Sequence, residues 1–164
     1  MKKIISLSVA VLLSVTFFAC SSSDDNPVDA VEVDAWVGTW LSAGTDVAPI
    51  LVSLFKYDSV KVQFKEDLTV SLQTHVKDGA WSTLPGVFTI TKSETGDVHS
   101  ININYSAFEQ GGIIQVIPGT QAKLKLEVVQ TVPNIGAVPR TPATGFGSDA
   151  ALGTLNIQNY VKIN

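Results

Sequence analysis

The chain has 164 residues, of which 15 are acidic, 11 are basic and one is a cysteine. With a formal net charge of −4 and lysines that are scattered singly after Lys2-Lys3, it has no basic patch of the kind that binds nucleic acid, so we expect no nucleic-acid partner. A single cysteine cannot form an intramolecular disulfide, so the hydrophobic core must stabilise the fold.

The first residues have the layout of a secretory signal. Lys2 and Lys3 precede an apolar stretch at 4–18, and the small Ala19 precedes Cys20. The stretch is shorter than the roughly 20 residues that span a bilayer, so we predict a cleaved signal peptide at 1–19. Cleavage removes two lysines, leaving nine basic against 15 acidic residues and a net charge of −6. The remaining chain is long enough for one domain.

Cys20 would be the first residue of the cleaved chain. A free thiol at this position of an exported protein is prone to oxidation, and acylation would remove that problem. The stretch Phe17-Phe18-Ala19-Cys20 resembles the lipobox of bacterial lipoproteins. The resemblance implies acyl chains on Cys20 that hold the protein to a membrane. The alternatives are a plain signal peptide or a buried thiol.

Residues 20–34 are predicted to form a flexible tether, because 21–27 are too polar to pack. Ser21 directly after the cysteine resembles lipoproteins released to the outer membrane. The Asp24-Asp25 pair is similar to the acidic tether of surface-exported lipoproteins of Bacteroidota. We therefore expect the protein at the outer membrane or the cell surface. An acidic domain is repelled by anionic lipid, so the acyl chains must provide the membrane attachment.

From residue 35 onwards most of the chain alternates apolar and polar residues with period two, which predicts strands buried on one face. Short turns such as 65–67 and Asp78-Gly79 join consecutive strands as hairpins. About eight strands are predicted, at 36–41, 60–64, 68–76, 88–90, 101–105, 113–117, 122–128 and 155–163.

One segment between the first two strands has a helical pattern instead. Its apolar residues recur at helical spacing, Pro49 lies in the first turn, and Thr45 or Asp46 can cap it. This stripe, which must lie on another apolar surface, is expected to cover the mouth of a barrel. Its residues are Val47, Ile50, Leu51, Leu54 and Phe55.

A second irregular segment, Thr131 to Gly153, is rich in proline and glycine. A loop of this length in a small domain is either functional or mobile.

Consecutive strands joined by tight turns predict an antiparallel meander, and closing it into a barrel removes both unpaired edges. We therefore predict an all-β fold over 35–164, an up-and-down antiparallel barrel of about eight strands with one short helix after the first strand. Such an interior is filled by side chains or holds one small ligand. The alternation of inward apolar residues is the same in both cases.

The stretch Trp36-Val37-Gly38-Thr39-Trp40 resembles the Gly-x-Trp signature of lipocalins and other calycins. The stretches 65–70 and 86–90 are similar to the hairpins of bacterial lipocalin-like domains. The resemblance implies that Gly38 and Trp40 form the barrel-closing motif, with the Trp40 ring plugging the closed end. Lipocalins stack an arginine of the last strand on this tryptophan, whereas Arg140 lies in the long loop and only Lys162 is available. The chain therefore resembles lipocalins without having their full pattern.

The sequence contains no pattern typical of a catalytic or metal site. His75 and His99 do not belong to a ligand-spaced cluster, and the glycine-flanked Ser148 lacks the strand-to-helix context of a nucleophile. We expect no enzyme activity, no metal and no cofactor.

The leading functional hypothesis is a lipid-anchored, monomeric envelope protein whose barrel binds a small hydrophobic molecule. An alternative is an envelope interaction module with a packed barrel and no ligand, which uses the helix or the loop as its contact surface. An enzyme or enzyme inhibitor is the third hypothesis. The candidate ligand-binding residues, for each of which core packing is an equal alternative, are Leu72, Ile90, Ile103, Tyr105, Leu124 and Leu126.

Overall fold

The computed structural model describes residues 33–164. The predicted signal peptide at 1–19, Cys20 and nearly all of the predicted tether lie outside the described residues. The described part of the chain contains no helix that could span a membrane.

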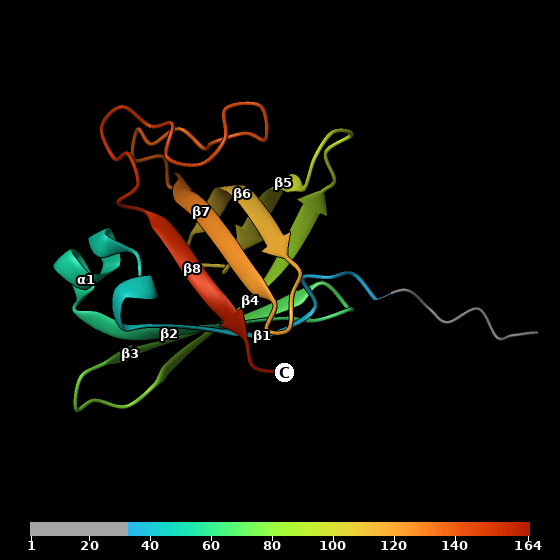
Figure 1. Cartoon of the computed structure of the whole chain (residues 1–164). Helices are drawn as coiled ribbons and strands as arrows, with labels where there is room; N and C mark the ends of the chain where they lie inside the picture. Colours follow the sequence, from blue (N-terminus) through green and yellow to red (C-terminus); the bar gives the residue numbers. More distant parts are fainter. Residues whose placement is uncertain (1–32) are drawn as a thin grey trace, which may run out of the picture. The chain divides into compact units, whose positions relative to one another are not determined.

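Residues 38–162 form one closed antiparallel barrel in which each strand pairs with its neighbours in the sequence (Figure 1). This confirms the predicted eight-stranded meander and its closure. The strands are β1 (Gly38–Ala43), β2 (Tyr57–Phe64), β3 (Thr69–Val76), β4 (Ser82–Thr91), β5 (Val98–Asn104), β6 (Glu109–Ile117), β7 (Lys123–Val132) and β8 (Ile157–Lys162).

The barrel closes where β1 pairs with β8, with Trp40 opposite Lys162. The Trp40 side chain is fully buried, and its Nε1–H donates to the Trp36 carbonyl oxygen at 2.8 Å. The Lys162 Nζ lies 5.2 Å from the centre of a Trp40 ring. Lysine therefore occupies the position beside the tryptophan at which the lipocalin resemblance implies an arginine.

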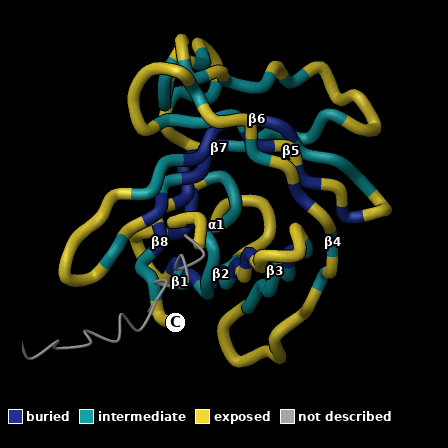
Figure 2. Tube along the Cα trace, turned by 90° about the vertical axis from the view of Figure 1, so that its right-hand side faces the viewer, coloured by how far each residue is buried: buried dark blue, intermediate teal, exposed yellow. Residues whose placement is uncertain are grey.

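The period-two pattern corresponds to the two faces of the barrel wall. On β2, Val60, Val62 and Phe64 are buried, whereas Gln63 between them is exposed. Burial in Figure 2 is concentrated on the strands, and exposed residues gather in the connections. The apolar side chains of alternate positions therefore form one continuous core inside the barrel.

The predicted helix is present as α1 (Pro49–Phe55), after a 3-10 helix at Gly44–Asp46. The predicted cap is wrong, because Ala48 is the N-cap residue and no side chain caps the helix. The first amides are bonded instead to β8 and to the segment before it: the Ala48 N–H donates to Gln158 Oε1 at 2.8 Å, and the Ile50 N–H donates to the Leu155 carbonyl at 2.9 Å. A long-range contact thus replaces the local cap and fixes α1 against β8.

The segment between β7 and β8 lies at one end of the barrel (Figure 1), and part of it packs on the outer face of β7. The Gly147 N–H donates to Glu127 Oε2 at 2.8 Å, and Lys125 Nζ lies 4.4 Å from the centre of the Phe146 ring. Glu127, on the face of β7 opposite to Leu126, is consequently buried at 1% exposure. The loop therefore covers the outer face of β7 around Glu127.

Asp149 organises the same loop and makes its stability dependent on pH. Amide hydrogen bonds from Leu152 and Ala151, and then the Arg140 guanidinium at 3.3 Å, hold the pKa of Asp149 below its ordinary value of 3.8. The folded state therefore binds this proton less tightly than the unfolded chain does. Its stabilisation is complete above pH 3.8 and is lost as the pH falls through the lowered pKa.

We expect Asp149→Asn to lower the free energy of unfolding at neutral pH, with a difference from the wild type that shrinks as the pH drops below the ordinary carboxyl pKa. Urea denaturation of both proteins across this range measures the difference. The pKa values of Asp58 and Asp67 are also lowered, but both residues are present in both proteins, so their contributions cancel in the difference between the two free energies of unfolding. A difference that stays constant with pH contradicts the assignment.

Candidate ligand-binding cavity

A cavity of about 650 Å³ lies inside the barrel beneath α1. Its volume falls within the roughly 300–1,000 Å³ that is typical of small-molecule sites. Most of the surface that lines it is apolar. The lining residues are Ala48, Ile50, Leu51, Leu54, Phe55, Tyr57, Val60, Val62, Leu72, Thr74, Ser82, Thr83, Leu84, Tyr105, Phe108, Gln110, Leu126, Val128, Gln130, Ile135, Asn156, Gln158 and Tyr160.

The cavity occupies only part of the barrel because the other part is filled by large side chains. On β2, Val60 and Val62 line the cavity, but Phe64 at the next inward position packs edge-on against Phe88 with ring centres 4.9 Å apart. On β7, Leu126 lines the cavity, whereas Leu124 belongs only to the packed core. The barrel is thus closed at the end that holds Trp40 and contains the cavity at the other.

Exposed apolar side chains surround the mouth of the cavity. Leu54 and Phe55 of α1 are 67% and 53% exposed, and Ile135 of the long loop is 63% exposed, yet all three line the cavity. An apolar molecule that enters past α1 therefore meets apolar surface from the outside inwards.

Two amide side chains interrupt the apolar lining on the β8 side. Asn156 and Gln158 are 9% and 4% exposed. Gln158 Oε1 accepts the Ala48 amide, but within residues 33–164 its Nε2 and both polar atoms of the Asn156 amide have no hydrogen-bond partner. Buried polar groups are usually paired, so these three atoms are free to pair with a molecule inside the cavity.

Two tyrosines also contribute to the wall. Burial raises the pKa of Tyr105 and of Tyr160, and the neighbouring Tyr105 raises that of Tyr160 further. Both hydroxyls consequently stay protonated at neutral pH and can donate a hydrogen bond. None of the lining side chains from the described part of the chain is an acid, a base or a histidine. The cavity is therefore uncharged.

The structure brings together half of the residues that the sequence analysis chose as candidate liners. Leu72, Tyr105 and Leu126 line the cavity. Ile103 and Leu124 are buried in the packed part of the core, and Ile90 is half-buried against it, so these three do not line the cavity. Gly38 and Trp40, which the resemblance names as the barrel-closing motif, lie on β1, and Cys20 lies outside the described residues.

Sequence reasoning missed the β8 residues that line the cavity. The apolar alternation that predicted a strand at 155–163 is that of Leu155, Ile157, Val161 and Ile163, but the residues that line the cavity are Asn156, Gln158 and Tyr160. Ile157 is buried even so, and Leu155 and Ile163 are 47% and 42% exposed. The period-two spacing of Asn156, Gln158 and Tyr160 was visible in the sequence, yet apolar character alone selected the opposite face.

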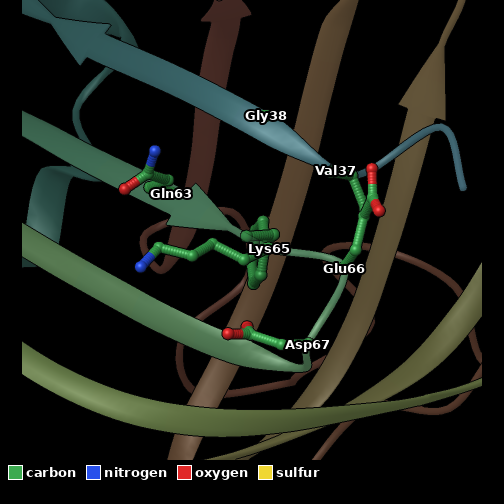
Figure 3. A pocket seen from close by; sticks show the side chains of 7 residues that line it. Val37, Gly38, Gln63, Lys65, Glu66 and Asp67 are labelled. Atoms are coloured by element: carbon green, nitrogen blue, oxygen red, sulfur yellow. The ribbon is translucent and has the colours of Figure 1, made fainter. Parts of the chain in front are cut away.

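A second depression, of about 380 Å³, lies over the turn between β2 and β3 and is open to solvent (Figure 3). In Figure 3 the side chains of Lys65 and Glu66 extend from the turn in different directions. Asp67 is already satisfied within the turn, because Oδ1 accepts from the Thr69 amide at 3.0 Å and from the Thr69 hydroxyl at 2.6 Å. These side chains do not converge on a common point, so this depression is not the candidate site.

The histidines lie outside the cavity and are held by other groups. His75 Nδ1 lies 2.6 Å from Asp58 Oδ1, and its ring packs on Trp81 with centres 5.0 Å apart. His99 Nδ1 accepts the Ser93 amide at 3.2 Å. Across residues 33–164 no three acidic, histidine or cysteine side chains gather as metal ligands.

Comparison with known proteins found no family model, no curated protein and no solved structure that matches the chain. The resemblance to lipocalins therefore remains a prediction from the sequence, and the barrel and its cavity stand on the geometry described above.

Proposed function

We propose that this chain is a lipid-anchored protein of the bacterial cell envelope whose lipocalin-like barrel binds a small hydrophobic molecule. The observation that carries the proposal is the uncharged, largely apolar cavity of about 650 Å³ that opens beneath α1. An apolar cavity of about 150 Å³ already binds benzene, so this one has room for a considerably larger molecule.

The driving force for binding is the transfer of apolar surface from water into the cavity. Each methylene that enters contributes about 0.8 kcal/mol, which corresponds to roughly fourfold in affinity. In a series of straight-chain alcohols, we expect the affinity to rise by roughly this factor per carbon and to level off once the chain fills the cavity. Displacement of the neutral fluorescent dye Nile red from the full mature protein measures the series.

A variant that fills part of the cavity locates the binding. Leu72 points into the cavity and Ser71 lies on the opposite face of β3, so Leu72→Trp and Ser71→Trp add the same ring on opposite sides of the wall. We expect Leu72→Trp to weaken the binding of the longest alcohols at least about tenfold, and the affinity to level off at shorter chains. Ser71→Trp should leave the affinities of the whole series unchanged. Equal effects of the two variants, or no binding by the wild type, contradict the proposal.

The membrane attachment is proposed on Cys20 and on the signal-like segment before it. We expect native mass spectrometry of the protein, extracted gently from its own membrane, to show the mass of acyl chains on the terminal cysteine together with any molecule that copurifies. Cys20→Ser should move the protein from the membrane fraction to the soluble fraction, because the acidic domain has no attraction of its own for anionic lipid. An unmodified terminal thiol contradicts the anchor and leaves the cavity test untouched.

The alternative, an envelope interaction module, draws support from the exposed apolar residues on α1 and the long loop, among them Leu54, Ile135 and Val138. It also required a packed barrel, with which the cavity disagrees. A protein that binds none of the alcohols yet retains a partner through these residues would favour this alternative.

A further inference from the structure

The polar groups of the cavity indicate which chemical class of ligand it takes, which its volume does not. Asn156 and Gln158 are two residues apart and face the same side, and both line a cavity whose walls are otherwise mostly apolar. Three of their four side-chain polar atoms have no hydrogen-bond partner within residues 33–164. Leaving buried amide groups unpaired is unfavourable, so a bound molecule that pairs with them gains affinity that a hydrocarbon cannot gain.

The orientation of the Gln158 amide is set by the fold. Its Oε1 accepts the Ala48 N–H at the start of α1 at 2.8 Å, so its Nε2 is the group left to donate. Asn156 adds one more NH₂ donor and one carbonyl acceptor. The two side chains together thus offer donors and one acceptor.

The cavity wall also disfavours a charged ligand. Among the described residues that line the cavity there is no lysine, arginine or histidine to pair with an anion, and no aspartate or glutamate to pair with a cation. The Tyr105 and Tyr160 hydroxyls remain neutral at physiological pH. Moving an unpaired ionised head group into such surroundings is strongly unfavourable.

We propose that the cavity selects uncharged amphiphiles whose head group both donates and accepts hydrogen bonds, such as an alcohol or a primary amide, over fatty-acid anions. Asn156 and Gln158 hold that head group, and the apolar wall holds the tail. A hydroxyl or carboxamide oxygen accepts from the free NH₂ groups, and its O–H or N–H donates to Asn156 Oδ1. This inference rests on the proposed ligand-binding function and names the class of its ligand.

The test compares ligands that share one tail, namely decanol, decanamide, decanoate and decane, on the full mature protein at mildly alkaline pH. We expect decanol and decanamide to bind at least about tenfold more tightly than decanoate. Because any apolar cavity prefers neutral ligands, the decisive comparison uses Asn156→Leu. This variant should weaken the binding of decanol and decanamide by about three- to tenfold, while the affinity for decane stays unchanged or rises.

Asn159→Leu is the matched control, because Asn159 lies three residues later on β8, is exposed and does not line the cavity. A second readout needs no substitution: the side-chain amide NMR signals of Asn156 and Gln158 should shift on addition of decanol and not on addition of decane. Failure of all four ligands to bind overturns the proposed function itself. Binding in which decanoate equals decanol, or in which Asn156→Leu and Asn159→Leu behave alike, overturns the selection and leaves the function standing.

Discussion

Replacement of Trp40 by alanine is expected to lower the free energy of unfolding by about 3–5 kcal/mol. The side chain is fully buried at the closed end of the barrel, on the strand that seals the sheet against β8. Its removal leaves a large void where the pairing between these two strands is short. Since small domains are stabilised by only about 5–15 kcal/mol in total, the variant should unfold at a much lower urea concentration.

Trp40→Phe separates the packing of the ring from its hydrogen bond. Phenylalanine keeps most of the buried area but cannot donate to the Trp36 carbonyl, which accepts from Trp40 Nε1 at 2.8 Å. We expect a loss of about 1–2 kcal/mol for this variant, well below that of alanine. A Trp40→Ala protein within about 1 kcal/mol of the wild type would show that this residue does not close the barrel.

Gly112→Ala is expected to destabilise the protein by about 3 kcal/mol or more, the upper range for overpacked cores. A Cβ atom at Gly112 would lie 2.0 Å from the Glu127 carbonyl oxygen, which belongs to the backbone of the neighbouring strand. The backbone cannot rotate away as a side chain can, so β6 and β7 must separate. Because β7 also contributes Leu126 and Val128 to the cavity, ligand binding should weaken together with stability.

The adjacent Gly111 provides the control. A Cβ there meets only side-chain atoms, of Asn102, Pro139 and Thr131, at 3.2 to 3.3 Å, and these can shift slightly. Gly111→Ala should therefore cost less than about 1.5 kcal/mol in the same urea denaturation. Equal losses in the two variants would mean that the approach of β6 to β7 is not the cause.

The number and order of the strands could be predicted because one face of most strands meets solvent. On β2, Val60, Val62 and Phe64 are buried inside the barrel, and the polar residues that alternate with them lie on its outer face. The helix was also predictable from its spacing, although its cap was not. Ala48 is bonded to Gln158, 110 residues away, and no local pattern encodes such a contact.

The cavity could be predicted only in part. Alternation shows which side chains point inwards, but it does not show how far along the barrel axis each one lies. Leu124 and Leu126 have the same pattern, yet only Leu126 reaches the cavity, because the packed end of the barrel encloses the other. The polar Asn156, directly before β8, and Gln158 on β8 point inwards, so a search for apolar alternation selected the wrong face. The inward polar residues break the alternation by which strands are found, and sequence rules often fail at sites of this kind.

The most direct test of the central claim, that the barrel holds a small molecule in its interior, is NMR of the methyl-labelled mature protein with bound decanol. Intermolecular nuclear Overhauser effects report which methyl groups touch the alkyl chain. We predict contacts with Val62, Leu72 and Leu126 inside the cavity. Contacts confined to exposed residues outside the cavity, such as Val52 and Val138, or no contacts at all, would contradict the account.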